Sequence, residues 1–260
     1  MLQLAAVGPR DHVIDLGSGD GRIVITAARR FGASGLGVEI VPELVQRSRA
    51  NARTAGVADR VEFREQDLFR TDLARASVVT MYLLPAVNLQ LRPRLLALAP
   101  GTRIVSHDWD MGDWAPEPTF VVDVPDKIIG RGKLSRVHLW IVPAQVHGLW
   151  CAPGVRLEVA QRFQPFSATL TEGAAPAPLL VFDGRIAGRE RVAGVQAQMR
   201  LTATADGLRL DTSALPGGVH AGRTFSRAGP RVCEHALPGR GAQPRWTRRE
   251  GGRGPTRAGF

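Results

Sequence analysis

Residues 13–21, with the sequence VIDLGSGDG, constrain this chain more than any other stretch. Their first apolar residues are typical of a short buried strand, and the apolar residues that recur from Ile23 to Phe31 are typical of a helix. Three glycines at alternate positions allow positive φ angles and a close approach of the backbone to a ligand. The start of the helix adds unpaired backbone amides. The stretch therefore predicts a strand, a ligand-binding turn and a helix in succession.

The same alternation of strand and helix continues to about residue 107. We expect further strands near residues 36–40, 61–64, 78–83 and 102–107, and helices near 23–31 and 42–55. Pro93 predicts a break after the fourth strand, with one short helix near residues 87–91 and another that begins at Pro93. Residues 2–7 are interpreted as the end of a helix. Such an order predicts an α/β fold with a mostly parallel sheet, closed by an antiparallel hairpin near residues 120–124 and 136–142.

The pattern changes after residue 143. Alternating apolar and polar residues separated by turns rich in glycine and proline predict a small antiparallel β appendage over residues 150–213. Residues 214–260 are rich in glycine, arginine and proline, and we expect them to be a disordered tail. The predicted division is therefore a ligand-binding domain over residues 1–143, the appendage, and the tail.

The formal charge of +10 is concentrated at one end of the chain. Residues 223–260 contain nine arginines against Glu234 and Glu250, and the chain has only two lysines, Lys127 and Lys133. A solvated basic tail is the interpretation that this distribution favours over a nucleic-acid arm. We therefore expect no specific nucleic-acid partner.

The remaining global features favour a cytoplasmic protein. Cys151 and Cys233 lie far apart without a metal-ligand spacing, which favours reduced thiols and predicts no metal site. The amino terminus lacks the charge pattern of a signal peptide, and the apolar run at residues 78–91 is too short to span a membrane. The sequence does not indicate an oligomeric state.

Two acids beside the glycine turn indicate the chemistry of its ligand. Asp15 precedes the first glycine by two residues, and Glu39 ends the next predicted strand. A carboxylate at Asp15 suits a cationic head group, and one at Glu39 suits the two hydroxyls of a ribose. A pyrophosphate would be repelled by Asp15 and by Asp20 inside the turn. The alternative is that Asp15 and Asp20 only cap the turn.

This pattern resembles the first motif of the class I S-adenosylmethionine-dependent methyltransferases, an acid followed by Gly-x-Gly-x-Gly. The resemblance implies a Rossmann-like fold with a seven-stranded sheet and S-adenosylmethionine as cofactor. It assigns cofactor binding to Asp15, Gly17, Ser18, Gly19, Gly21, Glu39 and Asp67. For Asp67, which would face the adenine amino group, the alternative is a carboxylate that caps the next turn.

Residues 15–24, 82–85 and 106–108 are similar to one branch of that class, the ATP-synthase c-subunit lysine methyltransferases and their bacterial relatives. A lysine amine in a protein is then the implied methyl acceptor. A small-molecule N- or O-methyltransferase and a non-catalytic protein that binds S-adenosylmethionine remain alternatives. Relatives carry a longer segment ahead of the first strand, so we expect either a more open cofactor site or an upstream start.

The carboxyl ends of the fourth and fifth predicted strands carry the candidate acceptor-side residues. Open parallel sheets bind ligands at this edge, and a neutral amine acceptor needs a group that steers or takes its proton. We assign this role to Tyr82, His107 and Asp108, with Asp110 behind them. Their structural alternatives are a core aromatic, a strand-end histidine and a turn acid. Trp109 and Trp114 are expected to pack the loop or to wall the acceptor pocket.

Overall fold

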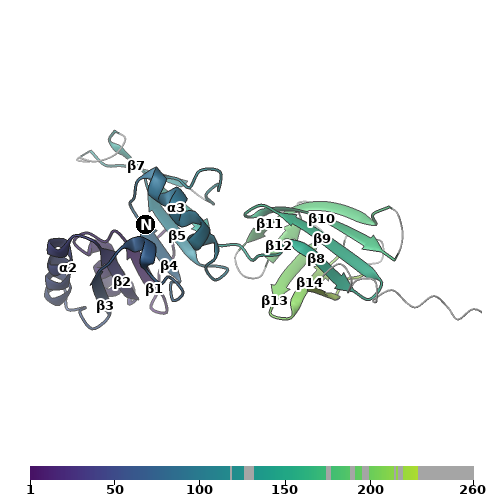
Figure 1. The fold of residues 1–260 in the computed structure, drawn as a ribbon, viewed down its shortest axis with the longest axis horizontal. Helices are drawn as coiled ribbons and strands as arrows, with labels where there is room; N and C mark the ends of the chain where they lie inside the picture. Colours follow the sequence, from purple (N-terminus) through teal and green to yellow (C-terminus); the bar gives the residue numbers. More distant parts are fainter. Residues whose placement is uncertain are drawn as a thin grey trace, which may run out of the picture.

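The computed structural model describes residues 1–117, 119–125, 132–173, 177–187, 191–194, 199–213, 215 and 219–227. Two sheets follow one another along this part of the chain, an open sheet with helices and a closed barrel (Figure 1). The seven strands of the open sheet are β1 (His12–Leu16), β2 (Ser34–Glu39), β3 (Val61–Glu65), β4 (Val78–Met81), β5 (Arg103–His107), β6 (Thr119–Asp123) and β7 (Leu134–Ile141).

The open sheet has the strand order β3-β2-β1-β4-β5-β7-β6. The pairs among its first five strands are parallel, whereas β7 is antiparallel to both β5 and β6. The helices between the strands are α1 (Arg22–Phe31), α2 (Pro42–Thr54), the 3-10 helix η1 (Leu68–Arg70) and α3 (Pro85–Leu96). This mostly parallel sheet with intervening helices confirms the predicted Rossmann-like α/β class.

Side chains from neighbouring positions of the central strands pack on opposite faces of the sheet. Val13 and Val78 join a cluster with the amino-terminal residues 1–7 and with Ala27 of α1. Ile14 and its neighbours on β4 and β5 join a second cluster with the apolar side of α3. Because both faces are covered, the strands read as continuous apolar runs. Asp15 interrupts that run at the carboxyl end of β1.

The two short helices predicted around Pro93 are in fact one helix, α3, with Pro93 inside it. A proline in a helix removes the hydrogen bond to the carbonyl four residues earlier. That residue is Leu89, which is 44% exposed, and Pro93 is itself exposed. Water can therefore replace the lost bond, and the buried residues Leu91 and Leu95 keep the helix on the sheet.

Two further local expectations were wrong. Residues 2–6 form hydrogen-bonded turns instead of a helix end, with Leu2 and Ala5 packed on the sheet beneath them. The fourth strand ends at Met81, so Tyr82 follows the strand and is 40% exposed. α3 begins at Pro85 with Leu84 as its N-cap, so Tyr82 and Leu83 form the connection between the strand and the helix.

The second sheet is a closed barrel with the strand order β10-β11-β12-β13-β14-β15-β8-β9. Its strands are β8 (Gly148–Ala152), β9 (Val155–Gln161), β10 (Pro165–Glu172), β11 (Leu180–Ala187), β12 (Arg191–Gly194), β13 (Arg200–Thr204), β14 (Gly207–Thr212) and β15 (Thr224–Arg227). Its interior is filled by buried apolar side chains; examples are Leu157, Leu170, Leu201 and Leu208. The barrel therefore has a hydrophobic core of its own.

The barrel extends past residue 213, where the sequence analysis ended the appendage. β15 pairs with both β14 and β8 and so closes the barrel. β15 has four residues, and only Phe225 among them is buried. An alternation this short in the sequence does not indicate a strand. The rest of the predicted tail, residues 228–260, lies outside the described residues, and so does Cys233.

Cys151 in β8 is disulfide-bonded, so its interpretation as a reduced thiol was wrong.

Within the described residues, no helix is long and apolar enough to cross a membrane.

Candidate functional site

The glycine turn joins β1 to α1 in a conformation that requires its glycines. Gly17, Gly19 and Gly21 have φ angles of 75°, 54° and 81°, a region that other residues rarely adopt. At Gly21 an added Cβ would also lie 2.7 Å from a ring carbon of Phe63. A Cβ added to Gly19, by contrast, would meet nothing within 4 Å. The turn thus packs closely on the protein at Gly21 and leaves space at Gly19.

Glu39 links the end of β2 to this turn. Its Oε2 accepts a hydrogen bond of 3.0 Å from the Gly19 amide, and its Oε1 accepts one of 2.8 Å from Ile40. The turn is held to the same strand from its other side, because the Gly17 and Ser18 amides both donate to the Val38 carbonyl. The structure therefore brings Glu39 and the glycines together, as the sequence predicted.

Asp15 is buried beneath the turn. Thr80, its neighbour in the register between β1 and β4, donates a hydrogen bond of 2.6 Å to the Asp15 Oδ1. Burial raises the pKa of Asp15 to about 7, and the Thr80 bond opposes that rise. The sequence analysis missed Thr80. A hydroxyl residue inside the apolar run of β4 was the available signal.

The remaining predicted cofactor residues lie at the same edge of the sheet. Ser18 is buried, and its hydroxyl has no hydrogen-bond partner among the described residues. Asp67 caps η1, since its Oδ1 accepts a hydrogen bond of 2.8 Å from the Phe69 amide. Asp20 is engaged by Arg22, whose hydrogen bonds to it lower the pKa of that carboxyl.

This set of groups fits S-adenosylmethionine. Two carboxylates, a buried unpartnered hydroxyl and a glycine turn with space beside Gly19 supply acceptors for an ammonium and a ribose together with backbone amides. They would not suit a pyrophosphate, because Asp15, Asp20 and Glu39 are all acidic.

The acceptor-side candidates Tyr82, His107 and Asp108 form one cluster at the carboxyl ends of β4 and β5. The Tyr82 hydroxyl donates to the Asp108 Oδ2 at 3.1 Å, and the Tyr82 and His107 rings lie 4.2 Å apart between centroids. The Asp108 Oδ1 lies 3.7 Å from the His107 Nε2 and accepts a hydrogen bond of 3.1 Å from the Arg136 amide. Burial, followed by the bond to Asp108, raises the pKa of Tyr82.

Asn88 in α3 is a second residue that the sequence analysis missed. It is fully buried, and its Nδ2 donates to the carbonyls of Trp109 and Asp110 and to the Ser106 hydroxyl, at 3.2–3.3 Å. Asp110 is not part of the Tyr82 cluster, since it is exposed and its Oδ1 accepts from the Gly112 amide. A buried asparagine on an apolar helix face was the available signal for Asn88.

The two loop tryptophans have different surroundings. Trp114 is fully buried and donates a hydrogen bond of 2.9 Å to Gln164 in the turn between β9 and β10. Packing is therefore its role in this structure. Trp109 is partly buried, and its carbonyl accepts from Ser106 at 2.7 Å.

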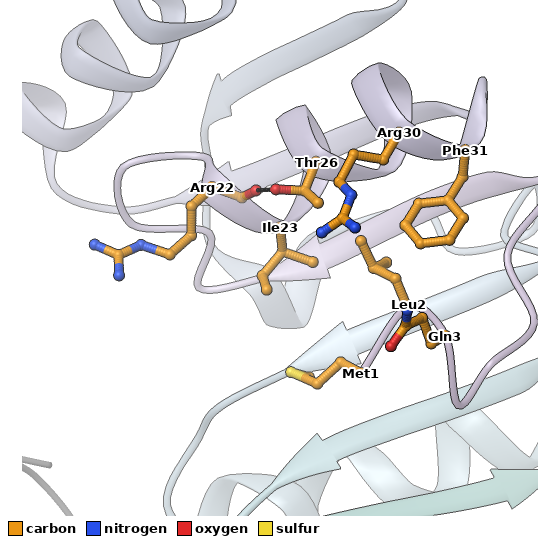
Figure 2. A pocket seen from close by; sticks show the side chains of 8 residues that line it. All are labelled: Met1, Leu2, Gln3, Arg22, Ile23, Thr26, Arg30 and Phe31. Carbon is orange, nitrogen blue, oxygen red and sulfur yellow. Dashed lines mark hydrogen bonds between the residues drawn. The ribbon is translucent and has the colours of Figure 1, made fainter. Parts of the chain in front are cut away.

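A separate pocket of about 290 Å³ lies along α1 (Figure 2). Figure 2 shows the first three residues of the chain facing the helix across this pocket. Its lining residues are Met1, Leu2, Gln3, Arg22, Ile23, Thr26, Arg30 and Phe31. These include none of the candidate cofactor or acceptor residues, so this pocket is separate from the candidate site. In the described part of the chain, no group of three or more metal-ligating side chains is present.

Known proteins with a similar sequence share the segment that contains this site. The model of a family described as the ANTKMT methyltransferase domain matches residues 15–118. A protein-lysine N-methyltransferase from Saccharolobus islandicus is 43% identical over 125 residues, which cover 47% of this chain and 78% of that protein. The ATP-synthase c-subunit lysine N-methyltransferase of Mus musculus is 38% identical over 111 residues, 42% of this chain and 44% of that protein.

A crystal structure described as an RNA methyltransferase from Salinibacter ruber, in complex with S-adenosyl-L-homocysteine, is also similar. It is 53% identical, with a TM-score of 0.50, and the match covers 56% of this chain and 89% of that one. The fold and the site together define a class I S-adenosylmethionine-dependent methyltransferase. Within that class, the chain belongs to the same family as the Saccharolobus protein-lysine N-methyltransferase. It is an enzyme, and S-adenosylmethionine is its cofactor.

Proposed function

We propose that this enzyme transfers the methyl group of S-adenosylmethionine to the side-chain amine of a lysine in a protein. The observation that carries the proposal is the cluster of Tyr82, His107 and Asp108 at the carboxyl ends of β4 and β5. The 43% identity with a protein-lysine N-methyltransferase supports the choice of acceptor.

On the cofactor side, we assign binding to Asp15, Gly17, Ser18, Gly19, Gly21, Glu39 and Asp67. Glu39 already accepts from the Gly19 amide, so a ribose hydroxyl bound by its carboxylate would lie beside the turn. A cationic ligand near Asp15 would favour the charged form of that carboxyl. Asp67 uses one oxygen as a cap, which leaves the other to accept from an amino group.

The cofactor supplies a methyl group on a positively charged sulfur, so the chain itself must mainly position the acceptor and exclude water. A lysine reacts only as a neutral amine and must lose a proton before the transfer. The Tyr82 hydroxyl donates a hydrogen bond to Asp108, and burial, followed by this bond, raises the pKa of Tyr82. The Tyr82 oxygen is our candidate to accept a hydrogen bond from the amine.

His107 lies against Tyr82 and is our candidate for the group that takes the proton. Asp108 holds both partners, because its two oxygens face the Tyr82 hydroxyl and the His107 ring. The Arg136 amide fixes this carboxylate from β7. We therefore describe Asp108 as a positioning residue.

The division of the chain is part of the same proposal. We assign residues 1–143 to methyl transfer and the barrel to a separate domain with its own core. The family model ends at residue 118, ahead of every barrel strand. The match to the Mus musculus enzyme covers less than half of that protein, so its acceptor is only a guide here.

The test is to incubate the full chain with S-adenosylmethionine labelled in the methyl group and with cell lysate, and then to separate protein, nucleic acid and small molecules. We expect the label in protein and, after hydrolysis, in N-methylated lysine. Label in RNA would contradict the proposal and would agree instead with the description of the Salinibacter protein. Label in small molecules, or cofactor binding without any transfer, would support one of the alternatives from the sequence.

A further inference from the structure

We infer that the turn between β9 and β10 of the barrel, residues 162–164, is a positioning element of the methyl-acceptor site. This inference rests on the proposed function. The turn contacts the loop that leads from Asp108 to Trp114, which we call the acceptor loop. The barrel would then take part in methyl transfer through the geometry of this loop.

Gln164 makes the most buried of these contacts. It is 2% exposed, its Oε1 accepts from the Trp114 indole at 2.9 Å, and its Nε2 donates to the Ile141 carbonyl at 3.3 Å. Trp114 is itself fully buried, and its carbonyl accepts a hydrogen bond of 2.7 Å from the Trp140 indole. Buried polar groups are costly to leave unpaired, so these bonds tie the end of the acceptor loop to the barrel and to β7.

Phe163 stacks on the other side of the same tryptophan. Its ring lies 5.9 Å from the Trp114 ring at an angle of 17°. The guanidinium groups of Arg92 and Arg162 lie 5.7 Å and 5.9 Å from the centroid of the Phe163 ring. Phe163 has a φ of 57°, an unusual angle for a residue other than glycine. The turn thus adopts a strained conformation that presents Phe163 to the loop.

Asp113, in the acceptor loop, forms ion pairs with both of these arginines. Arg92 of α3 and Arg162 of the barrel turn each form an ion pair with a different oxygen of its carboxylate. Arg162 is exposed and Arg92 and Asp113 are partly exposed, so the pairs contribute orientation more than stability. They place one loop carboxylate between the methyltransferase domain and the barrel.

The same loop is held at its other end by α3. Asn88 donates to the carbonyls of Trp109 and Asp110, and Arg92 donates to that of Met111. Asp108, at the start of the loop, has a φ of 65° and carries the carboxylate that faces Tyr82 and His107. A residue with this conformation keeps it only where its surroundings hold it. We conclude that α3 and the barrel turn, together with the Arg136 backbone of β7, set the position of Asp108.

The test measures methyl transfer by the full chain after a single substitution in the turn. Gln164→Met has a similar volume but removes the two side-chain hydrogen bonds of Gln164. We expect the kcat to fall about tenfold, the Kd for S-adenosylmethionine to stay within about twofold, and amide hydrogen exchange in residues 108–114 to accelerate. Thr202→Val is the matched control, because it removes a hydrogen bond to Asp211 between β13 and β14, three strands away around the barrel.

A second variant separates positioning from loss of stability. Trp114→Phe removes the donor of the same bond, so the double variant with Gln164→Met should lose little more activity than either single one. An unchanged kcat and unchanged exchange in Gln164→Met, or losses that multiply in the double variant, would overturn the inference.

The proposed function and this inference fail in different ways. The acceptor that the wild-type chain methylates in lysate decides the proposed function, whereas the ratio of variant to wild-type rate on that acceptor decides the inference. If the wild-type chain methylates nothing, hydrogen exchange in residues 108–114 decides alone whether the barrel turn holds the loop.

Discussion

The glycine turn and the acceptor loop both follow central strands of one sheet, yet they are held in different ways. The turn is closed by near neighbours in sequence, since Glu39 bonds the Gly19 amide 20 residues earlier. The acceptor loop is held by α3 about 20 residues before it and by Gln164, which lies 50 residues after Trp114. The bonds that close the glycine turn are therefore local in sequence, whereas the acceptor loop depends on distant parts of the chain.

The largest expected effect comes from the turn. Gly21→Ala places a Cβ 2.7 Å from the Phe63 ring and 2.8 Å from the Ser48 Cβ, at a φ of 81°. Strain and overpacking together should lower the free energy of unfolding by ~2–5 kcal/mol and abolish cofactor binding. Urea unfolding and calorimetry with S-adenosylmethionine measure both.

Gly56→Ala is the control for the backbone strain alone. Its φ is 69°, and an added Cβ there would meet nothing within 4 Å. We expect a loss of ~1–2 kcal/mol with normal cofactor binding. Equal losses of unfolding free energy in the two variants would show that the close packing at Gly21 does not contribute to stability.

The second effect is a pH dependence that originates at Asp15. Burial raises the pKa of Asp15 to about 7, above its value in the unfolded chain, so the folded state binds the extra proton between about pH 4 and 7. The free energy of unfolding should therefore fall as the pH rises through this window, by at most ~4 kcal/mol from this group.

Asp15→Asn does not titrate and serves as the comparison. The difference in unfolding free energy between wild type and this variant, followed by urea unfolding from pH 4 to 8, isolates the contribution of Asp15. A difference that does not change with pH would contradict the raised pKa.

The third effect separates the two halves of the site. Glu39→Gln replaces a charged acceptor with a neutral one and should weaken the binding of S-adenosylmethionine by ~1–3 kcal/mol in calorimetry. Glu62→Gln is the control, since Glu62 forms an exposed ion pair with Arg64 on the neighbouring strand β3. An unchanged affinity in Glu39→Gln would mean that other groups hold the ribose.

The smallest effect is expected in the acceptor half. Tyr82→Phe removes the hydrogen bond to Asp108 and should lower the kcat about tenfold, or ~1.4 kcal/mol, without a change in cofactor affinity. Thr119→Val, which removes a bond to His138 in the edge hairpin, is the control. Weaker cofactor binding in Tyr82→Phe would contradict the separation of the two halves.

The sequence analysis predicted some elements well and missed others for identifiable reasons. The strand, turn and helix around Gly17 to Gly21 were predicted because a short run of neighbours determines them. α3 was predicted as two helices because the rule for proline assumes that the lost hydrogen bond matters, whereas the exposure of Leu89 lets water replace it. β15 was missed because its one buried residue, Phe225, shows its role only when β8 and β14 lie on either side.

The sequence by itself determined the class of fold, the cofactor and the placement of Glu39 beside the glycine turn. Each depends on residues close together in the chain, where spacing dictates geometry. Only the tertiary structure showed that Thr80 bonds Asp15, that the Tyr82 hydroxyl bonds Asp108, and that Gln164 of the barrel holds the acceptor loop. These contacts join residues 26–65 positions apart, and strand pairing and burial bring such residues together without any local signal.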